Sequence, residues 1–392
     1  MTQYRYVIVG GGMTADAAVG GIRELDAGGS IGLFSADGHP PYNRPPLSKG
    51  LWKGDAEDGI WRTNVKQNVD VHLGRRIVRV DVQAKQVTDD TKAVHGFDKL
   101  LLATGGAPRR LAIDSPRVIH YRTYDDYKRL RDYATKPLRF LVVGGGFIGS
   151  EVAAALKIVG RDVTMLVPES GLCARVFPAD LSKNVTDYYR EKSVRAQTGD
   201  GVASIAARGD QIAVRTTTGQ EVTADVVVVG IGIQPDVALA EQAGLKVENG
   251  IVVDEHLRTS NPAIWAAGDV ANFMNLALGG RIRVEHEDNA NTMGKAAGRS
   301  MAGDAQPYTH LPFFYSDLFD LGYEAVGDVD ARLETVADWK TPFREGVVYY
   351  LKEGRVRGVL LWNTWNQVDH ARALIAERGP FTATNLRGRL PR

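Results

Sequence analysis

Two glycine fingerprints of the same type are the strongest indication of chemistry in the sequence. They occupy residues 10–15 (Gly-Gly-Gly-Met-Thr-Ala) and residues 144–149 (Gly-Gly-Gly-Phe-Ile-Gly). Each follows a short apolar run and precedes an alanine-rich segment, which is typical of a strand that turns tightly into a helix. The bare N-terminus of such a helix suits a pyrophosphate. One fingerprint is weak evidence, but two predict a chain that binds two dinucleotides, one held permanently and one exchanged.

Three further segments have small residues where backbone must approach a ligand closely. Residues 101–106 end in Ala-Thr-Gly-Gly, residues 229–235 contain two glycines, and residues 264–269 end in Gly-Asp. The carboxylate of the last segment can accept a hydrogen bond from a ribityl chain, while its glycine permits close approach. Together they indicate a flavin site and a nicotinamide site rather than any other pair of nucleotide sites.

Composition narrows the class of protein. The chain has 392 residues, of which 44 % are hydrophobic and 24 % charged, and its formal net charge is +1. These values predict a globular protein of two or three domains, with no electrostatic reason for a nucleic-acid partner. No apolar stretch approaches the roughly 20 residues that span a membrane. The first strand is expected from about Tyr4, which leaves no room for a targeting peptide, so a cytoplasmic location is expected.

The single cysteine, Cys173, excludes several reactions. A flavoprotein disulfide reductase needs a cysteine pair beside the flavin, and enzymes that use a thiol to reduce peroxide or that reduce coenzyme A disulfide need one cysteine there. Cys173 follows the second fingerprint and its strand, far in sequence from any segment expected at a flavin. We therefore expect a buried, apolar cysteine, no disulfide and no metal site.

The elements that position these motifs alternate between strand and helix patterns. Strands are predicted at 4–9, 30–35, 76–82, 99–103, 139–143, 162–167, 225–229, 251–253 and 263–266. Helices are predicted at 13–26, 124–133, 149–159 and 286–302. From about residue 307 the pattern becomes aromatic and alternating, which predicts a small sheet with strands in 311–319, 322–327 and 346–351 and a terminal helix at 366–377.

This order predicts an α/β protein with two Rossmann-like domains and a small C-terminal α+β domain. The first dinucleotide-binding domain comprises residues 1–112 and 245–306. It is interrupted by the second dinucleotide-binding domain, residues 113–244, and residues 307–392 form the C-terminal domain.

Two loops make the resemblance to a known family specific. They are residues 41–52 (Pro-Tyr-Asn-Arg-Pro-Pro-Leu-Ser-Lys-Gly-Leu-Trp) and residues 284–290 (Val-Glu-His-Glu-Asp-Asn-Ala). With the fingerprints, they resemble the two-dinucleotide flavoproteins, and within them apoptosis-inducing factor and the NADH-dependent ferredoxin reductases of bacterial dioxygenase systems. The resemblance covers essentially the whole chain and implies a glutathione-reductase-like fold without the redox cysteines. The long C-terminal insertion of the animal protein is absent, which favours a compact prokaryotic-type enzyme.

The resemblance implies that the first domain holds FAD. The residues it assigns to FAD are Gly10, Gly12, Ala15, Asp37, Arg44, Lys49, Ile77, Ala103, Thr104, Gly105, Arg109, Gly268, Asp269, Glu285, His286 and Tyr315. Two positions depart from the family pattern. Ala36 stands where the acid that holds the FAD ribose is expected, so that either Asp37 substitutes or the ribose is held otherwise. Tyr315 stands where the resembled proteins carry a tryptophan.

The resemblance also implies an NADH site in the second domain. The residues it assigns to NAD are Gly144, Gly146, Phe147, Ile148, Gly149, Glu151, Glu169, Gly232 and Glu285. Glu169 would accept from the adenosine ribose 2′-hydroxyl and repel a 2′-phosphate, which favours NADH over NADPH, although Arg161 and Arg175 flank it.

Two residues are implied in catalysis. Lys49 matches a lysine near flavin N5 and would form an ion pair with Glu151, at the junction of flavin and nicotinamide. The helix that follows Glu285 and His286 would point its N-terminus at flavin N1 and O2.

The implied function is that of an FAD-dependent NADH oxidoreductase of the ferredoxin–NAD⁺ reductase type. Hydride passes from NADH to flavin N5, and electrons then pass to an iron–sulfur partner, a ferredoxin, which would dock near Arg281 and Arg283. The alternative is a redox-responsive flavoprotein like apoptosis-inducing factor, which keeps a long-lived reduced flavin–NAD complex and turns over slowly. Reduction of a small radical or a quinone shares every motif, and a homodimer is left open.

Overall fold

The computed structural model describes residues 1–390, which form two compact units. The first unit contains residues 1–43, 57–107 and 234–312. The second contains residues 44–56, 108–233 and 313–390. The second glycine fingerprint and the C-terminal sheet thus belong to the same unit. The finer division into three domains, with the boundaries given above, stays a prediction.

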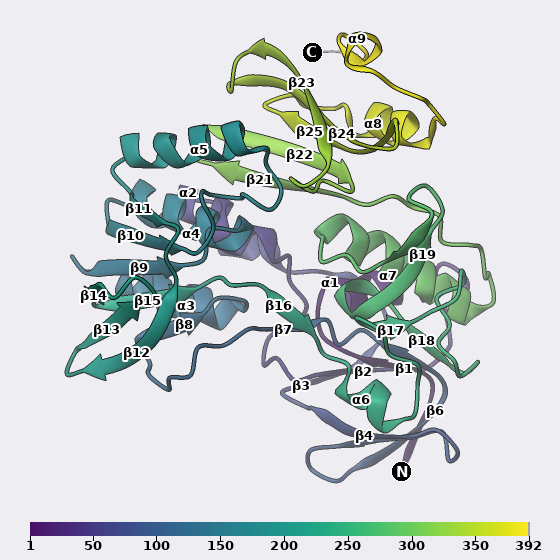
Figure 1. The fold of residues 1–392 in the computed structure, drawn as a ribbon. Coiled ribbons are helices and arrows are strands. Elements are labelled where there is room, and N and C mark those ends of the chain that lie inside the picture. The colour runs from purple at the N-terminus through teal and green to yellow at the C-terminus, as the bar shows by residue number, and fades with distance from the viewer. Residues whose placement is uncertain (391–392) are drawn as a thin grey trace. The chain divides into compact units, whose positions relative to one another are not determined.

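A seven-stranded sheet is the centre of the first unit (Figure 1). Its order is β3-β2-β1-β6-β5-β4, with β18 paired to β6. The strands are β1 (Thr2–Val9), β2 (Ile31–Ser35), β3 (Asp70–Leu73), β4 (Ile77–Asp81), β5 (Gln86–Asp89), β6 (Val94–Leu102) and β18 (Ile264–Ala266). Strands β3, β2, β1, β6 and β18 run parallel, so their carboxyl ends meet at one edge of the sheet.

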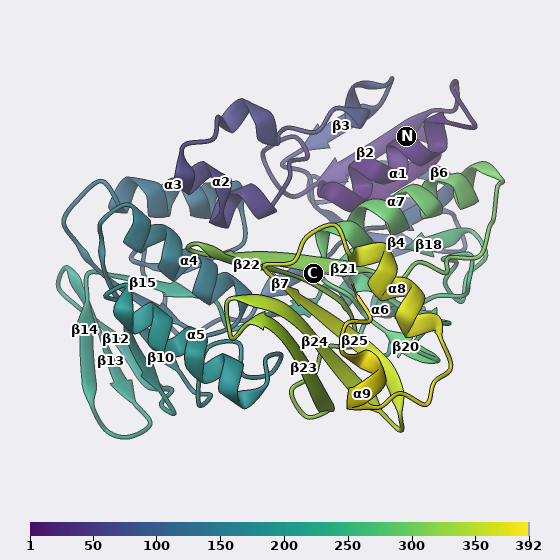
Figure 2. The ribbon, with the colours of Figure 1, turned by 90° about the horizontal axis from the view of Figure 1, so that it is seen from above.

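Helices α1 (Met13–Arg23) and α7 (Glu287–Ala302) lie side by side against this sheet (Figure 2). Their approach is close because α7 has glycines at the contact. A Cβ atom on Gly294 would lie 2.4 Å from the carbonyl oxygen of Thr14, and one on Gly298 would lie 2.1 Å from that of Ala18. Any larger residue would push the two helices apart.

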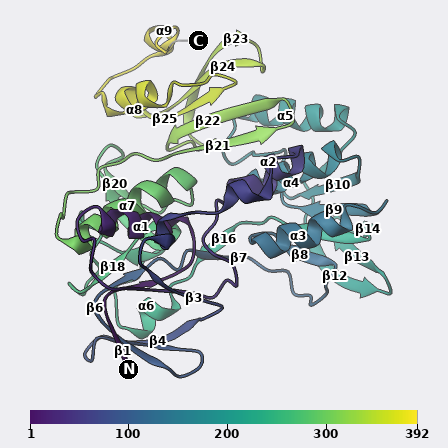
Figure 3. The same cartoon turned by 180° about the vertical axis from the view of Figure 1, so that it is seen from behind.

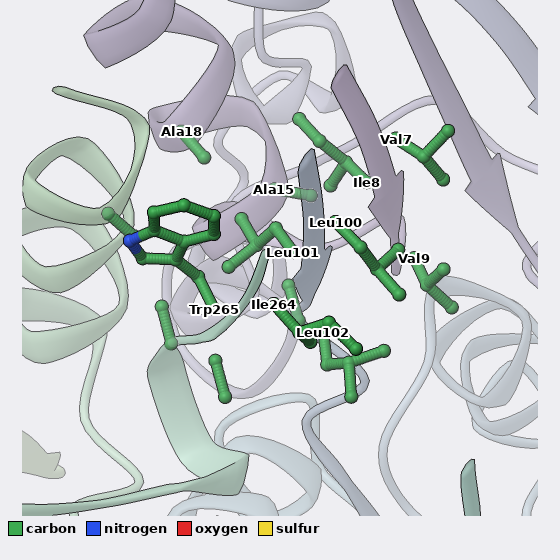
Figure 4. Packing of buried hydrophobic residues seen from close by; sticks show 14 of the residues in the cluster. Val7, Ile8, Val9, Ala15, Ala18, Leu100, Leu101, Leu102, Ile264 and Trp265 are labelled. Atoms are coloured by element: carbon green, nitrogen blue, oxygen red, sulfur yellow. The ribbon is translucent and has the colours of Figure 1, made fainter. Parts of the chain in front are cut away.

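The core of the first unit lies between the parallel strands and these helices. Ile8 and Leu101 lie towards Ala15 of α1 and Trp265 of β18, whereas Val7 points to the opposite face of the sheet (Figure 4). All five side chains are buried. The apolar runs read from the sequence as strands are therefore covered on both faces, as expected for parallel strands.

The remaining elements of the first unit are short. Helix α6 (Ala238–Gln242) and three 3₁₀ helices, η2 (Glu57–Ile60), η3 (Asn64–Lys66) and η4 (Gly268–Val270), accompany a small sheet. That sheet has the order β17-β19-β20, with β17 (Ile251–Val252), β19 (Ala271–Asn275) and β20 (Gly280–Ile282).

The second unit repeats the same arrangement around the second fingerprint. Its five-stranded parallel sheet has the order β11-β10-β9-β15-β8. The strands are β8 (Val118–His120), β9 (Arg139–Val143), β10 (Asp162–Val167), β11 (Arg195–Thr198) and β15 (Val226–Val229). The helices are α3 (Tyr124–Tyr133), α4 (Phe147–Ile158) and α5 (Ala179–Glu191). An antiparallel sheet of β12 (Val202–Arg208), β13 (Gln211–Thr216) and β14 (Glu221–Ala224) adjoins it.

A short loop segment of the second unit packs against α4. The 3₁₀ helix η1 (Pro45–Ser48) and helix α2 (Gly50–Lys53) both contact α4, and α2 lies beside it when the molecule is seen from behind (Figure 3). Residue Lys49 joins η1 to α2 and is therefore held between two turns rather than in a long loop.

The C-terminal part of the second unit is an antiparallel sheet of order β21-β22-β25-β24-β23. Its strands are β21 (Phe313–Leu318), β22 (Leu321–Gly327), β23 (Glu334–Thr341), β24 (Glu345–Lys352) and β25 (Arg355–Trp362). Strand β21 is an edge strand and contacts α4. Helices α8 (Val368–Ala376) and α9 (Ala383–Leu386) follow, and the short strands β7 (Gly106–Pro108) and β16 (Ile233–Pro235) pair with each other.

The predicted elements are present, with shifted ends. Helix α1 ends at Arg23 rather than at residue 26, because the Arg23 guanidinium donates to the carbonyls of Asp26 and Gly29 and stabilises a turn there. Helix α4 begins at Phe147 rather than at residue 149. Across residues 1–390, no helix is both long enough and apolar enough to cross a membrane.

Candidate active site

The first glycine fingerprint forms the turn between β1 and α1. Gly10 has a φ of +132°, and a Cβ atom on it would lie 2.1 Å from the carbonyl oxygen of Ala103. Ala103 directly follows β6, and its N–H donates to the carbonyl of Val9 at 2.8 Å. The two strands approach so closely at this end that only glycine fits at position 10.

The start of α1 has the features that a pyrophosphate requires. Gly12 is the N-cap residue, no side chain caps the helix, and a Cβ atom on Gly12 would meet no atom within 4 Å. Ala15 lies in the first turn and is fully buried. The backbone N–H groups of this turn therefore border open space, which fits the dinucleotide predicted for the first domain.

Residues predicted to approach FAD lie around the same turn. Gly268 has a φ of +77°, and a Cβ atom on it would lie 2.2 Å from the hydroxyl of Thr14 in α1. The Thr104 hydroxyl donates to the carbonyl of Asp236 at 2.7 Å, and the N–H of Asp236 donates to the carbonyl of Gly105 at 3.0 Å. The carboxyl ends of β6 and β18 thus lie near the first turn of α1, and the contact of these residues with FAD stays a prediction.

Asp37 lies just beyond β2, where the ribose acid is expected, but its carboxylate has partners in its own loop. It accepts from the N–H of His39 at 3.1 Å and from the hydroxyl of Tyr42 at 3.0 Å. Ala36 is exposed. The loop geometry gives Asp37 a structural role, and its role at a ribose stays a prediction, as does that of Ile77, which is buried at the start of β4.

Glu285 and His286 stand at the start of α7, with His286 as the N-cap residue. Glu285 pairs with Arg283 at 2.7 Å, and Arg283 also donates to the carbonyl of Asp269 at 3.1 Å. Burial lowers the pKa of His286 to about 4, although Asp269 and Asp288 act in the opposite direction. The imidazole is therefore neutral at neutral pH. The positive potential at the N-terminus of α7 then comes from the helix dipole and not from a charged histidine.

The second fingerprint repeats the geometry of the first. Gly144 has a φ of +106°, and a Cβ atom on it would lie 2.4 Å from the carbonyl oxygen of Gly230. A Cβ atom on Gly149 would lie 2.1 Å from the carbonyl oxygen of Gly144. Gly146 is the N-cap residue of α4, with no capping side chain and open space around its Cβ position. This turn fits a second dinucleotide.

Three other residues predicted to bind NAD, Ile148, Phe147 and Gly232, have different surroundings. Ile148 is 41 % exposed at the start of α4. Phe147 lies against the C-terminal sheet instead, with its ring centroid 4.8 Å from that of Phe314. Gly232 has a φ of +89°, and its carbonyl accepts from the N–H of Arg109 at 2.9 Å.

Glu169 follows β10, where the acid for an NAD ribose is expected, and it has a cationic neighbour. The Arg175 guanidinium contacts one carboxylate oxygen of Glu169 through two nitrogens, at 2.7 and 2.8 Å. The Arg175 side chain is 85 % exposed and that of Glu169 is 25 % exposed. This position thus presents both an anion and a cation.

Lys49 and Glu151 form the predicted ion pair. The Nζ atom of Lys49 lies 2.8 Å from Oε1 of Glu151, with side-chain exposures of 12 % and 3 %. Two serines also donate hydrogen bonds to the Glu151 carboxylate: Ser316 Oγ donates to Oε1 at 2.6 Å, and Ser48 Oγ donates to Oε2 at 2.5 Å. The pair is buried and every carboxylate oxygen has a donor, which is the condition under which such a pair is tolerated in a protein.

Tyr315 fixes the other side of the lysine. The Nζ atom of Lys49 lies 5.2 Å from the centroid of the Tyr315 ring, within the range of a cation–π interaction. Tyr315 itself is 36 % exposed on edge strand β21. The ammonium group thus lies between a carboxylate and an aromatic face.

The predicted FAD residues are divided between the units: Arg44, Lys49, Arg109 and Tyr315 belong to the second unit and the others to the first. The Arg44 guanidinium donates to the carbonyl of Arg122 at 2.7 Å. Of the predicted NAD residues, Glu285 belongs to the first unit and the rest to the second.

Ser48 and Ser316 were not predicted from the sequence. Each directly adjoins a residue that was, since Ser48 precedes Lys49 and Ser316 follows Tyr315. A serine carries little signal by itself, because its role here depends on contacts between segments far apart in the chain.

Cys173 has no feature of a redox cysteine. It is buried, burial raises the pKa of its thiol to about 12, and its neighbour is the hydroxyl of Ser150 at 3.9 Å. A thiol held in this form is a poor nucleophile. Within residues 1–390, no group of three histidine, cysteine, aspartate or glutamate side chains is placed to hold a metal ion.

Comparison with known proteins agrees with this geometry. The profile of the family described as pyridine nucleotide-disulphide oxidoreductase matches residues 4–294. The C-terminal profile of mitochondrion-associated apoptosis-inducing factor matches residues 297–342 and 337–377.

Individual relatives cover nearly the whole chain. The ferredoxin--NAD(+) reductase component of the anthranilate 1,2-dioxygenase system of Burkholderia cepacia is 35 % identical, over 95 % of this chain and 94 % of its own. Mitochondrial apoptosis-inducing factor 1 of Dictyostelium discoideum is 33 % identical, over 96 % of this chain and 79 % of its own.

Solved structures agree as well. The covalent putidaredoxin reductase–putidaredoxin complex gives a TM-score of 0.91 at 29 % identity, covering 98 % of this chain and 96 % of that chain. The ferredoxin reductase for the CYP199A2 system of Rhodopseudomonas palustris gives a TM-score of 0.86 at 30 % identity, covering 93 % and 92 %. FAD and NAD(H) are the cofactors of these relatives, and the two uncapped glycine turns fit them. The chain therefore belongs to the pyridine nucleotide-disulphide oxidoreductase family, in the group that contains the ferredoxin–NAD⁺ reductases and apoptosis-inducing factor.

Proposed function

We propose that the protein is an FAD-dependent NADH oxidoreductase that passes electrons to a small iron–sulfur protein, a ferredoxin. When bound, the cofactors supply the chemistry, which is hydride transfer from the nicotinamide to the flavin followed by electron release to the acceptor. The protein's own residues supply binding, orientation and charge.

The observation that carries this proposal is the Lys49–Glu151 pair. Glu151 lies on α4, in the first turns after the second glycine fingerprint, so the pair adjoins the expected nicotinamide site. By the family resemblance, Lys49 would lie near flavin N5, where a fixed positive charge would favour the arrival of hydride. A lysine so nearly buried would be costly without Glu151, and the pair lets the charge remain there.

Substrate choice is proposed to depend on Glu169. Its carboxylate would accept from the ribose 2′-hydroxyl of NADH and repel the 2′-phosphate of NADPH. The neighbouring Arg175 reduces that repulsion. The preference for NADH therefore depends on Arg175 staying paired with Glu169, where its charge is neutralised.

Relatives that act on ferredoxin and rubredoxin, and the neighbour solved with putidaredoxin, support an iron–sulfur partner. Arg281 and Arg283 are poor candidates for docking it. The Arg281 guanidinium donates to the carbonyls of Val253 and Asn272, and Arg283 is paired with Glu285. The docking surface is proposed to involve other residues. A cytoplasmic location belongs to the same proposal, and the oligomeric state is left open.

The test is anaerobic stopped-flow reduction by NADH, followed by addition of a ferredoxin. Rapid bleaching of the flavin absorption and rapid reoxidation by the ferredoxin support the proposal. Bleaching at the same rate with NADPH would remove the role of Glu169. A protein that NADH does not bleach is not an NADH oxidoreductase.

A second candidate is a redox-responsive flavoprotein like apoptosis-inducing factor. The match of residues 297–377 to the C-terminal profile of that protein favours it. In the same experiment, this candidate gives a reduced state that persists in the presence of ferredoxin, and that still persists when air is afterwards admitted.

A further inference from the structure

The Glu151 carboxylate has three donors and only one of them is the predicted partner. Oε1 accepts from Lys49 Nζ at 2.8 Å and from Ser316 Oγ at 2.6 Å, and Oε2 accepts from Ser48 Oγ at 2.5 Å. Ser48 also approaches the carbonyl oxygen of Pro45, but at 3.4 Å. Its hydroxyl has one proton, and the shorter contact shows that Glu151 receives it.

The carboxylate and its two serine donors come from three segments of the second unit that are distant in the chain. Ser48 ends η1, Glu151 lies on α4, and Ser316 lies on edge strand β21. The relative exposures of Ser48, Ser316 and Glu151 are 5 %, 1 % and 3 %. Water therefore does not compete for the carboxylate, and each lost donor leaves an oxygen with an unmet hydrogen bond.

Glutamate and lysine side chains have many rotamers, and an ion pair between two such side chains does not fix either of them by itself. A serine has a single rotatable bond before its hydroxyl and is held by its own backbone. Two serines on opposite oxygens restrict rotation of the carboxylate, and the carboxylate in turn restricts the lysine. Such support by neighbouring residues determines how well a reacting site is aligned.

We propose that Ser48 and Ser316 are positioning residues of the reductase reaction, which hold Glu151 from two sides and thereby keep the Lys49 ammonium at one place between the carboxylate and the Tyr315 ring. This inference rests on the proposed function. The role proposed for the serines differs from that of the Lys49–Glu151 ion pair, because both serines act on Lys49 only through Glu151.

The test is a double-mutant cycle on the flavin-loaded protein. Ser316→Ala and Ser48→Ala are made alone and combined with Glu151→Ala, a change that removes both acceptor oxygens. Ser182→Ala is the matched control, because Ser182 is also a buried serine of the second unit but its hydroxyl donates to the carbonyl of Leu172.

Two readouts are compared across these variants. The first is the limiting rate of flavin reduction by NADH, with the dissociation constant for NAD⁺ measured separately by fluorescence. We expect Ser316→Ala and Ser48→Ala each to lower the rate about fivefold, with the dissociation constant changed less than about twofold. In the Glu151→Ala background, neither change should lower the rate further, and Ser182→Ala should leave the wild-type rate unaltered.

The second readout is the urea midpoint of unfolding for the same proteins, which does not depend on turnover. Coupling between each serine and Glu151 shows that the hydrogen bonds exist in solution. Additive midpoints would overturn the network, and coupled midpoints with a wild-type rate would overturn the positioning role. If wild-type protein is not reduced by NADH at all, the proposed function fails, while the urea cycle still decides whether the serines hold Glu151.

Discussion

The ammonium of Lys49 and the carboxylate of Glu151 meet at 2.8 Å, although one belongs to a short turn near the N-terminus and the other to the helix of the second glycine fingerprint. The contact links the loop between η1 and α2 to α4, the helix that follows the second glycine fingerprint. Both charges are nearly buried, so each is tolerated only because the other is present.

Removing the lysine should therefore affect both stability and rate. Lys49→Ala leaves Glu151 buried without its cation and should lower the free energy of unfolding by about 3 kcal/mol. Loss of the positive charge should also slow flavin reduction by NADH about tenfold, equivalent to about 1.4 kcal/mol in the barrier. Stopped-flow absorbance and urea unfolding check the two effects.

Lys53→Ala is the control for this change. Lys53 lies on the adjacent helix α2 and pairs with Asp317 at 3.1 Å, but both side chains are substantially exposed. An exposed pair contributes little, so this variant should behave like wild type. Equal effects of the two substitutions on stability and on the rate of flavin reduction would show that Lys49 does not have the role proposed for it.

Glu169→Ala should erode the preference for NADH. Without the carboxylate, the Arg175 guanidinium loses its partner and becomes available to a 2′-phosphate. We expect the ratio of kcat/KM values for NADH and NADPH to fall about tenfold, mainly through a gain with NADPH. The double variant with Arg175→Ala should lose that gain. A ratio that stays at the wild-type value in Glu169→Ala would remove the residue from coenzyme recognition.

His286 predicts a pH dependence of stability. Its folded pKa of about 4 lies below the usual 6.5, so the unfolded chain binds a proton more readily between these values. The stabilising contribution of neutral His286 is present above about pH 6.5 and is lost as the pH falls towards 4. The slope should approach at most about 1.4 kcal/mol per pH unit. Urea unfolding across this range measures it, and His286→Gln should flatten the slope; an unchanged slope would assign it to other groups.

The contact between α1 and α7 predicts an unusual effect of alanine in a helix. Glycine to alanine in a helix interior normally stabilises by about 1 kcal/mol. Gly298→Ala should instead destabilise by about 2 kcal/mol, because its Cβ would lie 2.1 Å from the backbone carbonyl oxygen of Ala18. Gly28→Ala, at a position with open space, is the control. A thermal midpoint for Gly298→Ala at or above that of wild type would contradict the close packing.

Much of this arrangement could be predicted from the sequence, because the signals are local. A buried apolar run followed by closely spaced glycines predicts a strand, a turn and a helix, and both turns were predicted correctly. The helix at Tyr124–Tyr133 was predicted to the residue, since Thr123 and Asp126 form a capping box at its start.

Other elements lacked such a signal. The small sheet of β12, β13 and β14 was not predicted. Most side chains of β12 are exposed and β14 has only four residues, so neither has the buried pattern that marks a strand. Strand β6 begins at Val94 rather than at residue 99. Its first residues include Gly96 and Asp98, and they are strand because of pairing with β1 and β5 rather than through their own propensity.

The serines around Glu151 show the same limit at the site. Lys49 and Glu151 could be named from the resemblance, whereas Ser48 and Ser316 are common residue types in positions that no local pattern distinguishes. Only the packing of η1, α4 and β21 brings their hydroxyls to the carboxylate.

The most direct test of the account is the visible spectrum of the purified protein during anaerobic addition of NADH, followed by a one-electron acceptor. The account predicts a yellow flavin that bleaches quickly with NADH and then returns quickly as the acceptor is reduced. A colourless protein that cannot be reconstituted with FAD, or a flavin that NADH leaves unbleached, would contradict it.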